Sequence, residues 1–210
     1  LHDIMHVIRR HLPDIQRVSS YCLPRNLRNK TVDEMATLRE MGLDLFYVGC
    51  ESGDDLVLDR VKKGEDFETS LSALRKIKDA GARSSVMILN GMGGKKYSEQ
   101  HAKNSALLMN EAQPEYLATL VVSFPQGLAR YREQFPDFQP LEQQGLFSEI
   151  ERLLGQLELG DTVFRSDHAS NYLVLKGTLG ADKARMLSQV RAAIDSPATA
   201  RLRPEWMRAL

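Results

Sequence analysis

The stretch FYVGCESGDDLVLDRVKKG, residues 46–64, changes within a few positions from an apolar run to a helix-forming segment. The apolar run belongs to a predicted strand over residues 43–50, whose composition is typical of a sheet covered on both faces. A helix is predicted over residues 54–63, because it starts with acidic residues and ends with lysines, as the helix macrodipole favours. Glu51 lies between the two elements. The stretch therefore predicts one βα unit that places a carboxylate at the tip of a buried strand.

The same order of helix, glycine or proline break, and strand recurs along the first two thirds of the chain. Repeated βα units form parallel sheets with right-handed crossovers. A closed eight-stranded barrel needs about 250 residues, so this α/β chain of 210 residues forms part of a barrel or a small open sheet. In either case the loops after the strands carry function. Strands are predicted over residues 14–22, 43–50, 82–94 and 114–127, and helices over residues 1–12, 31–42, 54–63, 66–81 and 98–112.

The pattern changes near residue 140. Helices are predicted over residues 141–159 and 181–195, whereas residues 160–180 are polar and aromatic without a clear period. We therefore divide the chain into a βα part, residues 1–139, and a helical C-terminal extension that packs on it, residues 140–210.

Composition narrows the class of protein. Lys and Arg number 28, as do Asp and Glu, so the net charge is zero and nucleic acid is not an expected partner. No apolar run reaches the roughly 18 residues of a membrane span, and the N-terminus lacks a secretory signal. Two cysteines do not form a disulfide framework. A cytoplasmic protein is the expectation.

Two loops at predicted strand ends are candidate ligand sites. Glu51 can accept hydrogen bonds from two ribose hydroxyls, as carboxylates do in nucleotide sites; alternatively it caps the helix over residues 54–63 or pairs with a lysine. The loop NGMGG, residues 90–94, allows a ligand to approach the backbone closely, but an ordinary tight βα turn would also contain such glycines. Lys62 and Lys63 are interpreted as solvated charges at a helix end. The residues alone leave these alternatives open.

Histidines and cysteines give weaker signals. His168 lies in the segment FRSDHASNY, residues 164–172, which we interpret as a contact surface or a hydrogen-bonded plug. A catalytic triad is not expected there, since adjacent residues rarely converge in triad geometry. Cys22 and Cys50 are too few for a four-iron cluster and are interpreted as packing residues. No metal site is therefore predicted.

Taken together, the loops resemble those of the radical S-adenosylmethionine (radical SAM) superfamily, closest to the branch related to oxygen-independent coproporphyrinogen oxidases and to Elp3/MiaB/NifB-type proteins. Residues 47–64 are similar to the fourth-strand segment of that superfamily, VMILNGMGG at 86–94 to its fifth-strand glycine motif, and SFPQG at 123–127 to the turn after its sixth strand. Residues 164–187 resemble a C-terminal segment of the same branch. The resemblance implies a partial (β/α) barrel with about four parallel strands, the third to sixth of six, followed by the helical extension.

The resemblance also implies a binding site for S-adenosylmethionine at the strand ends, with Glu51 on the ribose hydroxyls. Ser20 and Tyr21 would face the substrate side of the cavity. In the superfamily, a [4Fe-4S] cluster reduces S-adenosylmethionine and a 5′-deoxyadenosyl radical forms. The further residues that would shape the cofactor site or contact the adenosyl group are Ser52, Gly53, Ile88, Leu89, Asn90, Gly91, Gly93, Gly94, Ser123 and Pro125.

The sequence departs from the superfamily pattern in one respect. It contains no CxxxCxxC cluster motif, and it starts at Leu1 within a helical pattern. We therefore expect a fragment of a radical SAM enzyme that is inactive alone and whose cluster ligands lie outside this chain. The alternative is a non-catalytic α/β module that dimerises or binds a partner through an exposed sheet edge. An aldolase-like barrel is discounted because we read no lysine inside the predicted strands that could serve as its nucleophile, and no substrate is predicted.

Overall fold

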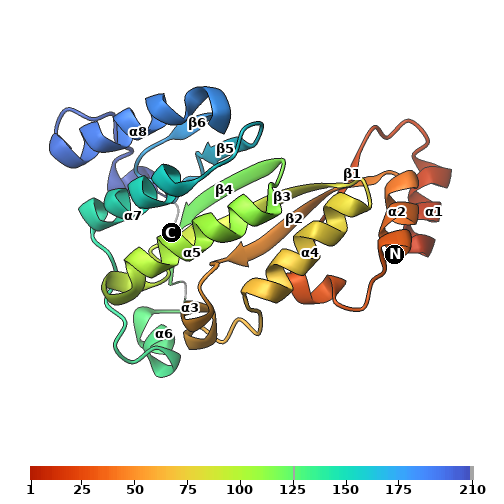
Figure 1. Cartoon of the computed structure of the whole chain (residues 1–210), viewed down its shortest axis with the longest axis horizontal. Helices are drawn as coiled ribbons and strands as arrows, with labels where there is room; N and C mark the ends of the chain where they lie inside the picture. Colours follow the sequence, from red (N-terminus) through yellow and green to blue (C-terminus); the bar gives the residue numbers. More distant parts are fainter. Residues whose placement is uncertain (125, 209–210) are drawn as a thin grey trace.

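The structure is a computed structural model that describes residues 1–124 and 126–208. Its centre is one sheet with the strand order β1-β2-β3-β4-β5-β6 (Figure 1). Neighbouring strands from β1 to β5 are parallel, whereas β6 runs antiparallel to β5. The strands are β1 Val18–Cys22, β2 Leu43–Glu51, β3 Arg83–Asn90, β4 Tyr116–Val121, β5 Val163–Ser166 and β6 Leu175–Thr178.

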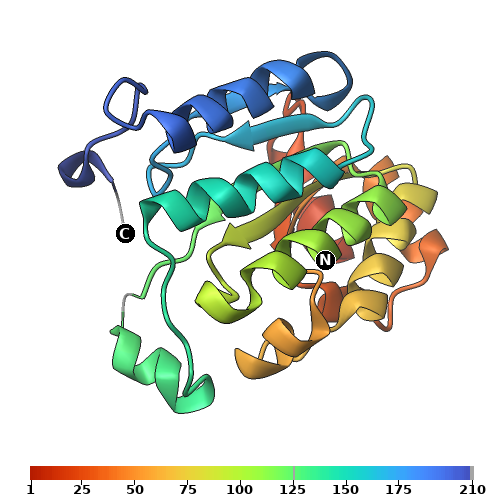
Figure 2. The same ribbon diagram turned by 60° about the vertical axis from the view of Figure 1, so that its left-hand side comes forward.

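Helices form a layer along one face of this sheet. In Figures 1 and 2, α4, α5 and α7 lie side by side in this layer, and α8 packs on α7 and β6. The short α6 lies beyond the carboxyl end of β4. The helices are α1 His2–His11, α2 Val32–Glu40, α3 Asp55–Arg60, α4 Phe67–Asp79, α5 Gly94–Ala112, α6 Leu128–Gln134, α7 Gln143–Gln156 and α8 Leu179–Asp195, with 3₁₀ turns η1 Pro24–Leu27 and η2 Glu205–Met207.

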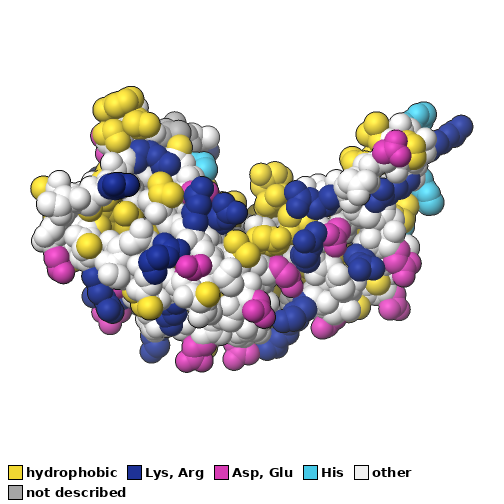
Figure 3. Space-filling view, turned by 90° about the horizontal axis from the view of Figure 1, so that it is seen from above, with side chains coloured by type: hydrophobic (Ala, Val, Ile, Leu, Met, Phe, Trp, Pro, Cys, Tyr) yellow, Lys and Arg dark blue, Asp and Glu magenta, His cyan; other side chains and the backbone are white. Residues whose placement is uncertain are grey.

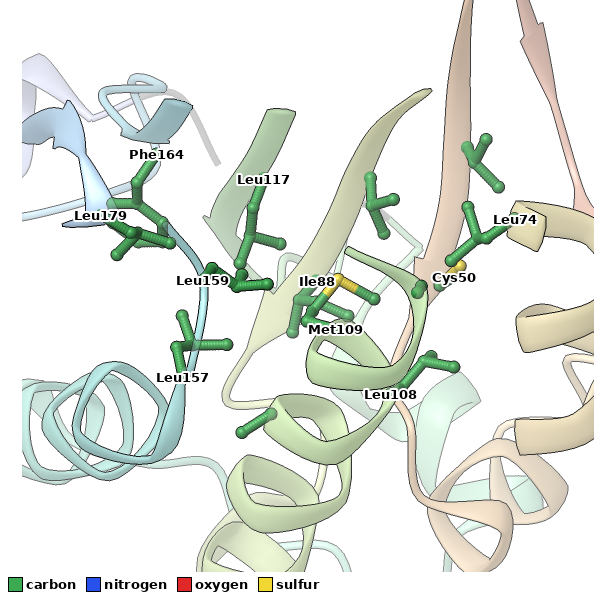
Figure 4. Packing of buried hydrophobic residues seen from close by; sticks show 14 of the residues in the cluster. Cys50, Leu74, Ile88, Leu108, Met109, Leu117, Leu157, Leu159, Phe164 and Leu179 are labelled. Carbon is green, nitrogen blue, oxygen red and sulfur yellow. The ribbon is translucent and has the colours of Figure 1, made fainter. Parts of the chain in front are cut away.

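The core lies between the sheet and the helix layer. Along β3, Val86 and Ile88 are fully buried while Met87 and Leu89 are half-buried, as expected when alternate side chains point to opposite faces. Figure 4 shows Ile88 close to Met109 of α5. The helix-facing side of β3 therefore contributes its buried apolar side chains to the core.

The opposite face of the sheet is more open. Tyr21 on β1 is 79% exposed, and its ring stacks on Tyr47 of β2 with 5.0 Å between the ring centroids. Figure 3 shows the molecule hollowed between its C-terminal elements and its N-terminal helices, with hydrophobic and basic side chains around the hollow. A partial barrel has such a face, because its strands do not close.

The predicted fold class, an α/β partial barrel, is confirmed. The C-terminal segment is not only helical, however, because β5 and β6 extend the sheet, and Phe164 and Leu179 enter the common core (Figure 4). Each of these strands has four residues, too short for a clear period-two pattern. Within residues 1–124 and 126–208, no helix is long and apolar enough to cross a bilayer.

Candidate functional site

Glu51 ends β2 with unusual backbone geometry. Gly49 pairs with Met87 and Glu51 with Ile88, so Cys50 is an extra residue in a β-bulge. Glu51 itself has a φ of +66°, a left-handed conformation that is uncommon for a residue other than glycine. Bulges and strained residues concentrate at functional sites, where they redirect side chains. The end of β2 is therefore shaped to aim one carboxylate.

The carboxylate of Glu51 turns back along the open face and meets Lys63. A Cβ atom added to Gly49 would lie 3.6 Å from Glu51 Oε1. Lys63 Nζ donates to this same oxygen, and the two side chains are only 11% and 26% exposed. The predicted pairing of Glu51 with a lysine is thus found. It leaves Glu51 Oε2 as the oxygen that this lysine does not occupy.

The two lysines at the end of α3 have different environments. Lys62 is exposed and lies 3.2 Å from Asp59, as expected for a solvated helix end. Its left-handed φ of +54° reverses the chain after α3, which directs Lys63 toward the open face. The interpretation as solvated charges is therefore right for Lys62 and wrong for Lys63.

The turn after Glu51 is held by α5. Asp54, 2% exposed, accepts hydrogen bonds from Gln100 Nε2 at 3.0 Å and from Asn104 Nδ2 at 2.6 Å. The backbone N–H of Gly53 donates to Ser105 Oγ at 3.0 Å. Buried polar groups that are fully paired rigidify the structure around them. The turn is consequently fixed from behind.

Replacement of Gly53 by alanine is expected to lower the free energy of unfolding by about 1 to 3 kcal/mol, as overpacking does. The new Cβ would lie 2.3 Å from the carbonyl oxygen of Asn104, so backbone must shift. Urea denaturation measures the change, and Gly155→Ala is a control, because a Cβ there meets no atom within 4 Å. Equal stability of Gly53→Ala and wild type would contradict this packing.

The glycine-rich loop begins at the end of β3, next to β2 in the sheet. Gly91 has a φ of +89°, which favours glycine, and its N–H donates to Glu149 Oε1 at 2.5 Å. Asn90 Nδ2 donates to the carbonyl of Leu146 at 3.2 Å. Gly93 caps α5, which begins at Gly94. The N–H groups of Met92, Gly94 and Lys95 also donate to backbone carbonyls, at 3.2, 3.0 and 2.8 Å. The loop is therefore held in one shape by internal hydrogen bonds where α5 begins.

A cavity of about 230 Å³ lies between the end of α3 and α6. Tyr131 lines it and donates from its hydroxyl to the carbonyl of Met92 at 3.1 Å. Burial raises the pKa of Tyr131, and the nearby charge of Glu51 adds to the effect. Val61 also lines the cavity and lies two residues before Lys63, so the cavity and the Glu51–Lys63 pair share one region. The lining residues are Val61, Ser123, Phe124, Gln126, Gly127, Arg130, Tyr131 and Gln134.

The structure distributes the remaining predicted residues over both faces of the sheet. Ile88 is 1% exposed and points into the core, whereas Leu89 packs in the aromatic cluster around α6. Tyr21 lies on the open face; the adjacent Ser20 alternates to the other side and donates to the carbonyl of Tyr21 at 3.1 Å. Pro125 lies outside the described residues. Glu51, the turn after it, the glycine loop and the cavity at Ser123 thus lie together at the carboxyl ends of the strands.

A family model described as the Radical SAM superfamily matches residues 2–109, slightly more than half of the chain. That range includes the bulged end of β2 and the glycine loop after β3. This chain belongs to the radical SAM superfamily. A comparison with curated proteins found no match.

Three solved structures are similar to this chain in fold. Elp3 from the archaeon Methanocaldococcus infernus is 15% identical, with a TM-score of 0.57 over 89% of this chain and 43% of its own. Methylornithine synthase (PylB) is 13% identical, with a TM-score of 0.52 over 96% of this chain and 63% of its own. HydG, a maturase of the [FeFe]-hydrogenase, is 13% identical, with a TM-score of 0.50 over 78% and 36%. This radical SAM chain therefore spans less than two thirds of each of these proteins.

The cysteines of this radical SAM chain do not fit an iron–sulfur cluster. Cys50 is buried and Cys22 half-buried, and burial raises the pKa of both thiols to about 12. A cluster needs thiolates, and the sequence has only these two cysteines. Among the described residues, no group of three His, Cys, Asp or Glu side chains could hold a metal ion.

Both thiols are expected to react slowly in the folded protein. A raised pKa keeps a thiol protonated at pH 8, and only the thiolate is nucleophilic. Iodoacetamide should alkylate Cys22 and Cys50 at least about tenfold more slowly in native protein than in urea, as followed by mass spectrometry. Equal rates in the two conditions would show that neither thiol is protected.

Two site residues were missed by the sequence interpretation. His101 and Glu149 are 1% and 2% exposed and contact the two ligand loops from behind. His101 shares the buried side of α5 with Tyr97 and Ser105, and Glu149 interrupts the apolar side of α7. A polar residue on an apolar helical face was the available signal.

Proposed function

We propose that this chain forms the adenosyl-binding part of a radical SAM enzyme. The observation that carries the proposal is the carboxylate of Glu51, which a bulge and a left-handed backbone aim onto the open face beside the glycine loop. Glu51 Oε2 accepts from a ribose hydroxyl, while Lys63 holds Oε1 in place. A charged acceptor strengthens such a hydrogen bond.

The neighbouring elements complete the proposed site. The backbone at Ile88, Leu89 and residues 90–94 lines the adenosyl group, with the shape fixed by Gly91. The cavity next to Ser123 receives the adenine, a flat and largely apolar ring that suits the aromatic lining. Ser52 and Gly53 act indirectly, because they bond His101 and Ser105 of α5 and shape the turn. Tyr21, on the open face, lies on the proposed substrate side.

S-adenosylmethionine supplies radical chemistry in this superfamily. Cys22 and Cys50 do not suit a [4Fe-4S] cluster, so we assign no step of radical formation to residues of this chain. Their contribution is to bind and orient the nucleoside.

Titration with S-adenosylhomocysteine, followed by ¹H–¹⁵N NMR, tests the proposal. This probe retains the adenosine and needs no cluster. Amide signals of residues 51–54, 90–94 and 123 should shift together and saturate, while signals of α8 stay unchanged. Shifts confined to other regions, or none up to the solubility of the probe, would exclude the site.

A second candidate is an interaction module. β1 lies at the end of the sheet among the described strands, and its Tyr21 is exposed. An open strand edge pairs readily with another chain, so a homodimer through β1 is the specific form of this alternative. Sedimentation analysis over a concentration series distinguishes the two: a dimer in a protein that shows no NMR response to the nucleoside favours the module.

A further inference from the structure

His101 joins the two ligand loops from the helix layer. Its Nδ1 lies 2.8 Å from Ser52 Oγ in the turn after β2, and its Nε2 lies 3.1 Å from the carbonyl oxygen of Leu89 before the glycine loop. The ring is 1% exposed. One side chain of α5 therefore bridges loops that belong to neighbouring strands.

The partners fix the direction of these hydrogen bonds. A carbonyl oxygen only accepts, so Nε2 of His101 carries a proton, and in that tautomer Nδ1 is the acceptor. Ser52 Oγ then donates to Nδ1 and in turn accepts from the N–H of Asp54 at 3.0 Å. A continuous chain of donors thus runs from the β2 turn through the imidazole to the end of β3.

Glu149 of α7 extends the connection. Its Oε1 accepts from the N–H of Gly91 at 2.5 Å and lies 3.8 Å from His101 Nε2. Its Oε2 is buried and has no hydrogen-bond partner among the described residues. An apolar residue of similar size would cost less at a buried position. Stability alone gives no reason to place a carboxylate there, whereas control of the Gly91 loop does.

We propose that His101 and Glu149 are positioning residues that hold the Glu51 turn and the Gly91 loop as one unit. A change in one loop then alters the affinity that the other loop contributes to nucleoside binding. Neither residue touches the ligand. The inference rests on the proposed function, because the two loops are the two sides of the proposed adenosyl site.

Four variants at these positions remove the hydrogen bonds of His101 and Glu149 one at a time. His101→Asn keeps an acceptor near the position of Nδ1 and loses the contact with Leu89, whereas His101→Gln reaches Leu89 and loses Ser52. Glu149→Gln retains an oxygen for the Gly91 N–H, and Glu149→Leu removes it. Val190→Ala in α8, a fully buried residue outside both loops, is the control that lowers stability alone.

The first readout is affinity for S-adenosylhomocysteine by NMR titration, compared with the melting temperature of each variant. Both His101 variants and Glu149→Leu should lose affinity about fivefold or more, the lower range of typical coupling. Glu149→Gln should bind like wild type, and Val190→Ala should bind like wild type despite a lower melting temperature. A loss that simply follows melting temperature across all five variants would overturn the proposal.

The second readout needs no ligand. Ser52→Ala alters only the β2 turn, yet it should accelerate hydrogen exchange at the Gly91 amide about fivefold or more, because His101 loses its anchor. Unchanged exchange at Gly91 would overturn the coupling. If wild type does not bind the nucleoside, the proposed function fails while this readout still decides whether the loops are coupled.

Discussion

Replacement of Asp54 by alanine is expected to lower the free energy of unfolding by about 2 to 4 kcal/mol. Asp54 caps α3 through the N–H of Val57 at 2.9 Å. It also accepts the side-chain amides of Gln100 and Asn104. Alanine removes the cap and leaves both amides without their acceptor in a partly buried site. The loss therefore exceeds that of a cap alone.

Urea denaturation measures this change. Asp59→Ala is the matched control: Asp59 belongs to the same helix, but its side chain is 77% exposed, so its loss should stay within about 0.5 kcal/mol. Asp54→Asn keeps an acceptor for the helix cap but places an NH2 group near the side-chain amides of Gln100 and Asn104, which also donate. Its loss of unfolding free energy should lie between those of Asp54→Ala and Asp59→Ala. If Asp54→Ala is no less stable than Asp59→Ala, the turn is not anchored as described.

Replacement of Glu51 by glutamine is expected to weaken binding of S-adenosylhomocysteine about tenfold to hundredfold, the range for a hydrogen bond to a charged group. Glutamine has nearly the same shape, but when its carbonyl oxygen stays on Lys63 its NH2 group, which only donates, replaces the oxygen that accepts from the ribose hydroxyl. Lys63 also loses the negative charge with which it pairs. The main effect should therefore be on affinity and not on the fold.

Glu99→Gln provides the control for Glu51→Gln, because it removes the same charge from an exposed position on α5. NMR titration gives the affinities, and circular dichroism verifies that both variants are folded. Equal affinities of the two variants would show that Glu51 does not contact the nucleoside.

Local signals in the sequence were sufficient to predict several helices and strands. Thr31 and Glu34 have the spacing of a capping box, and they form one at the start of α2, with bonds of 3.1 and 2.8 Å. The alternation of helices and apolar strands likewise indicated the parallel sheet. Such features depend on residues three or four apart, so they can be read without tertiary contacts.

Other features depend on contacts between distant segments. The contact of Lys63 with Glu51 requires the left-handed turn at Lys62, and nothing in a pair of lysines predicts that one of them is half-buried in an ion pair. His101 lies 49 residues from Ser52, the residue it bonds. β5 and β6 form because they continue an existing sheet. For these, the packed structure supplies what the sequence pattern lacks.

A crystal structure of the chain with S-adenosylhomocysteine tests the central claim most directly. The account predicts that the ribose hydroxyls lie within hydrogen-bond distance of the Glu51 carboxylate, with the adenosine along residues 90–94 and the adenine at the Ser123 cavity. A nucleoside bound elsewhere, with Glu51 contacted by Lys63 alone, would contradict it.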